Sequence, residues 1–385
     1  MVSDIISNIL KEYSELGIVL AVALLTLFVV QMVLQANVFG RIASFRLMDR
    51  KQIRESEPAI SVVIPLFSED YIYLDTSLVT MLTQDHKEFE VVLVYVGNDT
   101  NFFDDIKSLQ RLYPHLTPVH INCSPRYPVS SKIALNVGIK SSKYDFIITS
   151  TPDATPASDR WLSLLARGFV YGDIVLGYCG IERQKGFKNF IFREYQFSNA
   201  MTWISAATKQ NTYAASRNAL GFTKELYFNV RGFNHLNMNV GEDDLFLQQI
   251  ATRDNVSVVL SPRAACRERS WNNWRWWWQR AKALYTTRKY YPKRTTTKST
   301  TELVTRMLFF ASVVAALIVM PWEFKVAAMV LTAVRLLYVL FITMRNARRV
   351  GERGLIGLHF IYDIIEPFVR LFIAIGSSRN EKQSW

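Results

Sequence analysis

The chain has 385 residues, of which 50% are hydrophobic and 20% charged, with 16 glycines and 12 prolines, and this composition excludes a disordered, collagen-like or low-complexity protein. Its three scattered cysteines exclude a disulfide scaffold and offer no zinc site, which indicates a reducing compartment. The net charge of +12 suits nucleic acid, a membrane surface or an anionic substrate, and the positions of the charges decide between them.

The first predicted element is a membrane span near the N-terminus. No charged residue occurs between residues 16 and 40, and residues 17–34 are almost entirely apolar, which is long enough for the roughly 20 residues that cross a bilayer core. Basic residues follow this run, beginning with Arg41 and Arg46. Because positive charge gathers on the cytoplasmic side, we expect the N-terminus outside and the following chain in the cytoplasm.

Two more apolar runs, residues 307–322 and 326–344, predict a membrane hairpin near the other end of the chain. Only Arg335 interrupts the second run, and arginines follow it from Arg345 onward. All three spans obey one topology with basic ends in the cytoplasm. Much of the charge surplus therefore flanks the membrane, and we do not expect a nucleic-acid partner.

A polar stripe marks residues 355–376. His359, Asp363, Glu366 and Arg370 recur at helical spacing on an otherwise apolar helix. Such a helix either lies in the membrane interface or packs its stripe inside a bundle, and the sequence leaves both arrangements open.

Between the membrane segments, short β-branched runs alternate with helical stretches. The runs at residues 61–65, 90–96, 119–121 and 146–149 predict strands, and helices are expected between them at 76–84, 104–113 and 132–140. This alternation predicts an α/β domain with a mostly parallel sheet and helices on both faces. Ligands of such sheets bind beyond the carboxyl ends of the strands.

Acidic residues follow three of the predicted strands. Glu69 and Asp70 come after the first, Asp99 after the second and Asp153 after the fourth. Each alone is typical of a turn or a helix cap. Together they predict a site for Mg²⁺ or Mn²⁺ and phosphates, since these cations prefer a few carboxylates plus phosphate oxygens.

Three adjacent acids, Glu242, Asp243 and Asp244, precede an apolar helical run. They either complement the dipole at a helix start or supply a general base, because neighbouring carboxylates raise the proton affinity of at least one of them. The spacing alone leaves both interpretations open.

Five motifs follow one another along the chain: residues 61–65, the pattern Lys132-x-Ala-Leu-Asn136-x-Gly-Ile, Thr151-Pro-Asp153, residues 241–245, and Gln279-Arg280 after a tryptophan cluster. This ordered set resembles the family 2 glycosyltransferases. The membrane-bound branch with cellulose, chitin-oligosaccharide, hyaluronan and poly-N-acetylglucosamine synthases is the most similar. The resemblance implies the GT-A fold for a cytoplasmic domain at residues 57–270. An N-terminal helix and basic linker (1–56), a Trp-rich interfacial segment (271–300) and a membrane hairpin plus one more helix (301–385) flank it.

The resemblance also implies roles for individual residues. Asp153 corresponds to the second carboxylate of the metal-binding DxD motif, and Asp243, preceded by Glu242, corresponds to the general base. The residues expected beside the nucleotide and its diphosphate are Glu69, Asp99, Lys132 and Asn136. Those expected over the acceptor and the nucleotide are Trp278, Gln279, Arg280 and Lys282.

This sequence departs from the family pattern at three places. Thr151 replaces the first Asp of DxD, and Tyr95 and Val96 stand where a pair of aspartates is usual. The last motif, QxxRW in the family, has Lys282 at the Arg position and Ala283 at the Trp position. The last departure weakens the prediction of processive polymerisation.

The tryptophan run at residues 271–278 permits two uses. On a helix, Trp271, Trp274 and Trp278 share one face, which predicts an interfacial helix with indoles at the headgroup level. Alternatively, Trp278 stacks on an acceptor sugar.

The resemblance implies an inverting transfer from a nucleotide sugar, with a UDP-sugar favoured, to a glycan or lipid-linked acceptor. Mg²⁺ or Mn²⁺ is the expected cofactor, and a bacterial inner membrane with its lipids is the expected location. A processive polysaccharide synthase and a catalytically inactive sugar-binding subunit are the alternatives, and a homo-oligomer or an export partner is compatible with all three. A glycosidase, which also pairs carboxylates, has no use for a metal and diphosphate site.

Overall fold

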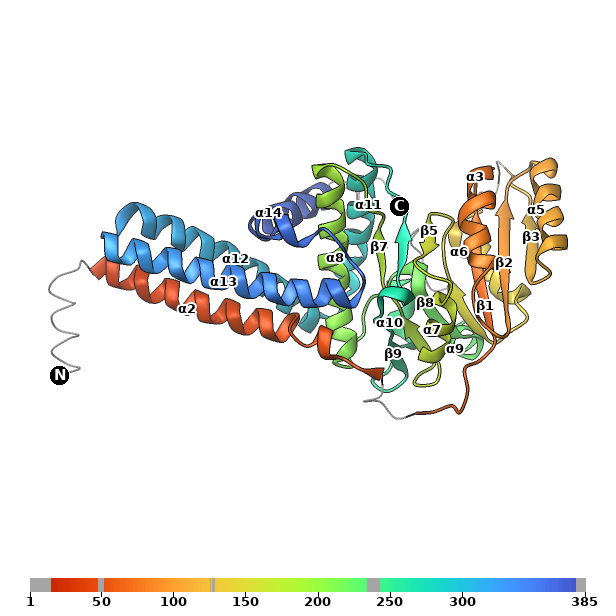
Figure 1. Cartoon of the computed structure of the whole chain (residues 1–385), viewed down its shortest axis with the longest axis horizontal. Helices are drawn as coiled ribbons and strands as arrows, with labels where there is room; N and C mark the ends of the chain where they lie inside the picture. The colour runs from red at the N-terminus through yellow and green to blue at the C-terminus, as the bar shows by residue number, and fades with distance from the viewer. Residues whose placement is uncertain (1–14, 48–51, 125, 127–128, 234–242, 379–385) are drawn as a thin grey trace. The chain divides into compact units, whose positions relative to one another are not determined.

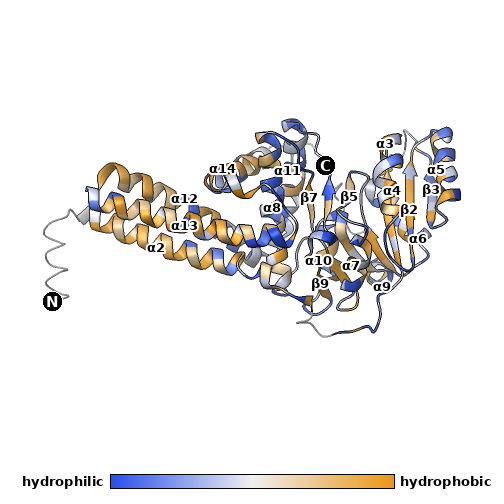
Figure 2. Cartoon of the chain, viewed as in Figure 1, coloured by the Kyte–Doolittle hydropathy of each residue, from blue (hydrophilic) through white to orange (hydrophobic). Residues whose placement is uncertain are grey.

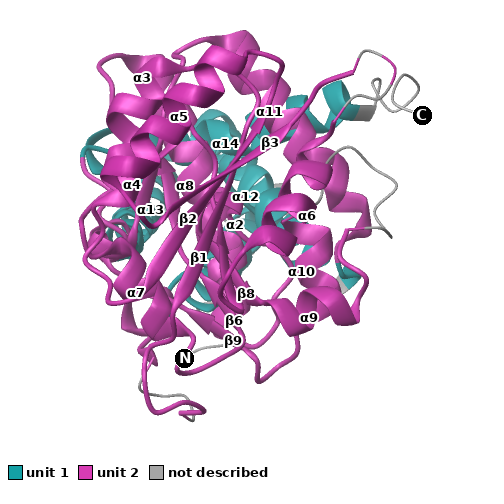
Figure 3. Cartoon of the chain, turned by 90° about the vertical axis from the view of Figure 1, so that its right-hand side faces the viewer, with its two compact units in different colours: residues 1–41, 292–346, 354–385 teal, residues 42–291, 347–353 magenta. Residues whose placement is uncertain are grey.

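The computed structural model describes residues 15–47, 52–124, 126, 129–233 and 243–378. The chain divides into two compact units, coloured separately in Figure 3. The first unit contains residues 1–41, 292–346 and 354–385, and the second contains residues 42–291 and 347–353.

The first unit is helical. Its elements are α2 (Glu15–Val38), α12 (Lys293–Val319), α13 (Trp322–Arg349, whose last residues belong to the second unit) and α14 (His359–Ser378). In the described chain, α2, α12 and α13 are long and apolar enough to cross a membrane, as the three expected spans require. Apolar residues predominate along these three helices (Figure 2). They pack through Leu24, Phe309, Val313 and Ala328.

Several charged side chains also lie in the interior of this helical unit. Arg306 of α12 pairs with Glu302, Asp363 and Glu366, and all four side chains are buried. Arg335 of α13 is fully buried and pairs with Asp363 of α14. Its guanidinium also donates to the Gln31 side chain of α2 at 3.0 Å. A shared ionic network therefore connects the four helices.

The polar stripe of α14 faces this network. His359, Asp363 and Glu366 are buried, whereas Phe368 and Phe372 on the same helix are exposed. Of the two arrangements that the sequence left open, the structure shows the stripe packed against other helices of the unit.

The second unit contains a seven-stranded sheet in the order β3-β2-β1-β4-β8-β6-β9. Strands β1 to β4 are parallel, and β8 runs antiparallel to both of its neighbours. The mostly parallel sheet predicted from the sequence is confirmed. The strand bounds are β1 (Ile60–Leu66), β2 (Phe89–Val96), β3 (Leu116–Ile121), β4 (Phe146–Thr149), β6 (Ile174–Leu176), β8 (Leu220–Thr223) and β9 (Val256–Val258).

Helices flank this sheet (Figure 1). The helix predicted at 76–84 begins earlier, at Tyr71, because Asp70 caps it by accepting from the Tyr73 backbone N–H at 3.0 Å. It is made up of α3 (Tyr71–Tyr73), the π-helical turn η3 (Leu74–Leu78) and α4 (Val79–Leu82). The other helices are α5 (Thr100–Leu112), α6 (Ser131–Ser141), α7 (Trp161–Gly168), α8 (Phe187–Thr208), α9 (Lys224–Asn229), α10 (Asp244–Ile250) and α11 (Trp274–Thr286).

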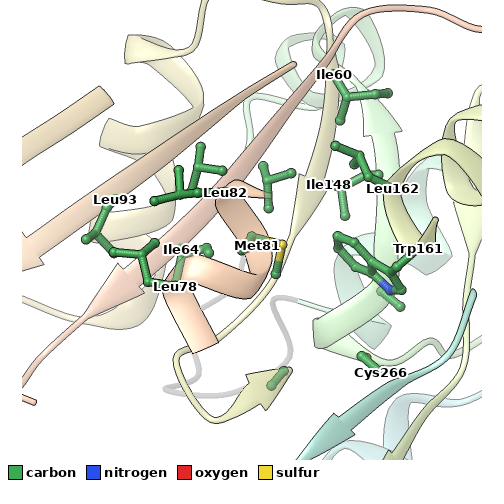
Figure 4. Close-up of a cluster of buried hydrophobic side chains, with 14 of the residues drawn as sticks. Ile60, Ile64, Leu78, Met81, Leu82, Leu93, Ile148, Trp161, Leu162 and Cys266 are labelled. Carbon is green, nitrogen blue, oxygen red and sulfur yellow. The ribbon is translucent and has the colours of Figure 1, made fainter. Parts of the chain in front are cut away.

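A continuous hydrophobic core joins the sheet to its helices. In Figure 4, Trp161 and Leu162 of α7 lie with Ile148 of β4 in one buried cluster. Gly138 lets α6 approach the sheet on its other side, because a Cβ there would come within 2.5 Å of Val63 Cγ1. Close packing of this kind tolerates little change in volume.

A second, three-stranded sheet has the order β5-β10-β7. Its strands are β5 (Ala154–Pro156), β7 (Cys179–Ile181) and β10 (Cys266–Glu268). Antiparallel pairing sets Glu268 of β10 opposite Ala154 of β5. This register brings the end of β10 beside Asp153.

The segment at residues 347–353 holds this small sheet. Glu352 is buried and pairs with Arg193 of α8 and Arg267 of β10. The Tyr178 hydroxyl donates to the same carboxylate at 2.8 Å. Arg267 also donates to the Gly351 carbonyl at 2.8 Å. One carboxylate with two arginines thus fixes β10 to the segment that follows α13.

Candidate functional site

Asp153 lies at the carboxyl edge of the seven-stranded sheet, shortly after β4. Its backbone carbonyl accepts from the Arg269 N–H at 2.7 Å. The charges of Arg269, Arg280 and Asp70 all act on its carboxyl group. Burial raises the pKa of Asp153 above its ordinary value and outweighs the two arginines, which lower it. A carboxyl group in this environment favours a further positive charge beside it.

Asp70 supplies a second carboxylate at the same edge. One of its oxygens caps α3, and the other lies 3.4 Å from the Arg269 guanidinium. Asp70 and Arg269 both remain partly exposed. The edge therefore combines two carboxylates with cationic groups that suit phosphate oxygens.

Glu268 positions Arg280 next to Asp153. The Arg280 guanidinium binds the buried Glu268 carboxylate through both of its terminal nitrogens, at 2.5 and 2.6 Å. Burial raises the pKa of Glu268, and Arg280 opposes this effect. Such a bidentate pair restricts the orientation of the guanidinium. Arg280, expected over the acceptor, thus lies on the same side as Asp153.

Thr151 occupies the position at which the family pattern has its first aspartate. Its hydroxyl donates to Asn218 Oδ1 at 2.8 Å, and Asn218 Nδ2 lies 3.5 Å from the Glu268 carboxylate. No carboxylate replaces the missing one at this position. In the described residues, no group of three or more Asp, Glu, His or Cys side chains is arranged to hold a metal ion. Asp153 and Asp70 nevertheless offer hard oxygen donors, which fit a cation that takes its other ligands from phosphates and water.

Two of the residues expected near the nucleotide, Glu69 and Asp99, meet at Tyr95. The Tyr95 hydroxyl donates to Glu69 Oε1 at 2.5 Å and accepts from the Asp99 N–H at 3.2 Å. Burial and the bond to Glu69 raise the pKa of Tyr95 to about 12, so it stays a neutral donor. Asp99 caps α5 by accepting from the Asn101 and Phe102 N–H groups. The tyrosine that departs from the family pattern thereby links Glu69 and Asp99.

Lys132 and Asn136 lie one turn apart on α6. Both are partly buried, and Asn136 Oδ1 accepts from the Tyr227 hydroxyl at 3.1 Å. Asn136 therefore bonds to α9, and Lys132 lies on the same face of α6 because of the helical spacing.

Asp243 and Asp244 differ in their surroundings, and Glu242 lies outside the described residues. Asp243 is partly exposed, and its Oδ1 caps α10 by accepting from the Asp244 N–H at 2.9 Å. Asp244 is buried, and its carboxylate accepts from the Thr287 hydroxyl at 2.6 Å and from the Tyr291 hydroxyl. Burial and the charge of Asp243 raise the pKa of Asp244 to about 7. The helix-start interpretation therefore holds for both residues, and Asp243 is the more accessible one.

The tryptophan run is only partly helical. Helix α11 begins at Trp274 with Asn273 as its cap, so Trp271 lies outside the face that the sequence predicted. The buried ring is Trp277, which stacks on Phe192 of α8 at a centroid distance of 5.2 Å. Trp278 and Lys282 are partly buried, and Gln279 is exposed.

Sequence reasoning missed Glu268 and Arg269. They occur in the alternating run Cys266-Arg-Glu-Arg-Ser270, and this alternation was the available signal. Their proximity to Asp153 depends on the pairing of β10 with β5, strands far apart in the sequence.

Comparison with solved structures identifies similar folds. The mannosyltransferase PcManGT from Pyrobaculum calidifontis, solved with GDP-Man and Mn²⁺, is 15% identical over 91% of this chain and 99% of its own, with a TM-score of 0.55. TarS 1-349 from S. aureus, solved with UDP and with UDP-GlcNAc, is 15% identical over 84% of this chain and 92% of its own, with a TM-score of 0.42. A search of curated protein sequences finds no match.

A sequence family covers most of the chain. The profile of glycosyl transferase family 21 matches residues 18–371. The coarser expectation of a glycosyltransferase is confirmed, whereas family 2 and its cellulose and chitin branch are not. The chain is a glycosyltransferase and belongs to glycosyl transferase family 21.

Proposed function

We propose that this chain transfers a sugar, with inversion, from a nucleotide sugar to a membrane-associated acceptor. The observation that carries the proposal is the group of Asp153, Asp70, Arg269 and Arg280 at the carboxyl edge of the sheet. This edge is where α/β sheets bind their ligands, and its mixed charges suit a diphosphate together with a cation.

Asp153, with Asp70 beside it, would hold Mg²⁺ or Mn²⁺. When bound, the cation neutralises charge that develops on the departing diphosphate. Arg280, fixed by Glu268, and Arg269 offer guanidinium groups to the same phosphates. The Mn²⁺ and GDP-Man bound to the mannosyltransferase PcManGT support this chemistry, and the sequence resemblance favours a UDP-sugar as the donor.

Asp243 is the proposed general base, with Glu242 as the alternative. Its carboxylate accepts the proton of the acceptor hydroxyl while that oxygen forms its bond to the anomeric carbon and the nucleotide leaves from the opposite face. Glu69, Asp99, Lys132 and Asn136 are the proposed nucleotide contacts. Trp278, Gln279 and Lys282 are the proposed acceptor contacts.

The acceptor is proposed to be a lipid-linked sugar or a glycan at the inner membrane of a bacterium, with the second unit in the cytoplasm. Three helices apolar enough to cross a membrane support this location. A processive synthase that makes a cell-surface polysaccharide is the alternative within the same chemistry.

A donor panel tests the proposal. Purified full-length protein in nanodiscs made with bacterial lipids is given UDP- and GDP-sugars with Mn²⁺, and nucleotide release and product mass are measured. We expect one class of donor to give a glycosylated lipid. Arg111→Gln, an exposed change on α5, is the control for Arg280→Gln, which we expect to weaken donor binding. Absence of transfer with every donor would contradict the proposal.

A further inference from the structure

One cavity of the larger unit lies apart from the residues assigned to sugar transfer. It has a volume of about 380 Å³. Its walls come from residues just after α2, from the end of α7, from the chain that follows β9 and from the end of α13. None of the residues proposed for donor, acceptor or metal binding lines it.

Three arginines line this cavity, Arg46, Arg167 and Arg349. Within the described chain none of them forms an ion pair, so three positive charges converge without a carboxylate. Arg46 and Arg167 are exposed, whereas Arg349 is partly buried. Like charges brought together in this way repel one another, and an anion between them relieves the repulsion.

Arg349 is held in place by the backbone. Its Nη2 donates to the Phe45 carbonyl at 3.1 Å, and its buried Nε has no hydrogen-bond partner in the described structure. The bond to Phe45 orients the guanidinium without neutralising it. Guanidinium groups bind phosphate through paired N–H donors, which makes arginine the residue best suited to such a ligand.

The remaining walls are mostly apolar. Besides Ser261, the cavity is lined by Phe45, Leu47, Leu164 and Tyr171 and by the buried Val258, Val259 and Leu260. A cavity with apolar walls and three cationic groups suits a ligand that joins a phosphate to a hydrocarbon part. Its volume falls in the range of small-ligand sites.

Chain continuity connects two walls of this cavity to helices α2 and α13. Arg349 is the last residue of α13, and Phe45 follows α2 by only a few residues. Both helices are apolar enough to cross a membrane. Basic pockets at the ends of membrane helices commonly bind the headgroups of anionic lipids.

We infer that this cavity binds the phosphate headgroup of an anionic phospholipid from the bilayer around α2 and α13. The inference rests on the proposed membrane location and not on sugar transfer. Its test therefore reads binding, and a failure of the proposed activity leaves it unaffected.

The test compares lipids that differ in charge. Full-length protein in neutral detergent is titrated with dihexanoyl-phosphatidylglycerol and with dihexanoyl-phosphatidylcholine, and bound lipid is counted by native mass spectrometry. We expect the anionic lipid to bind at least about tenfold more tightly. Arg46→Gln with Arg167→Gln should weaken its binding by about tenfold or more, because each loses a charge-assisted contact. Arg349 is left unchanged in this variant, since it also bonds to Phe45.

The matched control is Arg111→Gln with Arg253→Gln, two exposed arginines away from the cavity. It removes the same charge, and we expect it to bind lipid as the unchanged protein does. Equal affinity for the two lipids would overturn the inference. So would an equal loss of affinity for the anionic lipid in both double variants. The protein is also titrated with inorganic phosphate and with glycerol 3-phosphate. Tight binding of inorganic phosphate alone would show a site for free phosphate and would also overturn it.

Discussion

Asp243 and Asp244 are neighbours in the chain but occupy different environments. Asp244 is buried and accepts from two hydroxyl groups, so its carboxylate ties α10 to residues 287–291. Asp243 is partly exposed and uses one oxygen as the helix cap. A general base must reach the proton that it accepts, which favours Asp243.

Asp243→Asn should therefore reduce sugar transfer by about 10²-fold or more, the usual contribution of a positioned base, while donor binding stays nearly unchanged. Asparagine keeps the oxygen that caps α10, so the helix start is preserved. Transfer rates and nucleotide affinity are measured on the same preparation. Transfer within a few-fold of the original would move the role to Glu242.

Asp244 predicts a pH dependence of stability. Its pKa of about 7 in the folded protein lies above the ordinary carboxyl value of about 3.9 in the unfolded chain. Between these values the folded state retains a proton that the unfolded state has lost. The free energy of unfolding should therefore fall, by up to about 1.4 kcal/mol per pH unit, as pH rises from about 4 to 7.

Asp244→Asn should flatten that dependence, because the amide does not titrate and still accepts from Thr287 and Tyr291. Thermal unfolding between pH 4.5 and 8 measures the slope. Asp104→Asn, an exposed carboxylate on α5, serves as the control. If the free energy of unfolding of Asp244→Asn varies with pH as steeply as that of the unchanged protein, other groups cause the pH dependence.

We predict that Mn²⁺-dependent binding of the donor requires the Asp153 carboxylate. Asp153→Ala should abolish Mn²⁺-dependent binding of the donor, because Thr151 is a hydroxyl bonded to Asn218 and supplies no compensating charge. Mn²⁺ bound in the presence of nucleotide is measured by electron paramagnetic resonance. Asp70→Asn should weaken Mn²⁺ binding less than Asp153→Ala does, because the Asp70 carboxylate is already engaged as a helix cap and in a pair with Arg269. Full turnover of the unchanged protein under chelator would contradict the assignment.

At the scale of elements, local patterns predicted the parallel strands and the helices that are apolar enough to cross a membrane. The β-branched runs of β1, β2 and β4 lie within a residue or so of their predicted bounds, because strands buried on both faces are apolar throughout. The short strands β5 and β10 carried no such signal, since they contain only three residues each. Their long-range pairing creates the environment of Asp153, which explains why Glu268 and Arg269 escaped prediction.

From the ionic network of α12, α13 and α14, we predict that removing one charged partner lowers the free energy of unfolding strongly. Arg335→Leu leaves the buried Asp363 with fewer partners, and breaking a buried pair typically costs about 3–5 kcal/mol. Arg335→Leu combined with Asp363→Leu should cost less than the single change. Thermal unfolding of the detergent-solubilised protein compares them. A single variant as stable as the unchanged protein would show that the pair contributes little.

At the scale of the whole molecule, the number of membrane helices bears on the length of the product. Polysaccharide export requires a closed polar pathway, since unsatisfied polar groups are costly in lipid. The described helices include only three that are apolar enough to cross, and the charged side chains inside their unit pair with one another. Ala283 also stands at the position where the family 2 pattern has a tryptophan, the residue proposed there to stack on an acceptor sugar. These features favour addition of one or a few sugars to a membrane acceptor over processive synthesis.

We therefore expect short products. Purified protein in nanodiscs receives radiolabelled donor and lipid extract, and the products are resolved on a gel and by mass. Mass increments of one or a few sugars on a lipid are the expected result, whereas processive synthesis would give a high-molecular-weight ladder from this chain alone. Crosslinking before the assay shows whether any ladder comes from oligomers, because several copies together can form a pathway that one copy lacks. Ala283→Trp supplies the matched test of the acceptor contact: if the missing ring limits chain growth, restoring it should lengthen the products without changing donor affinity.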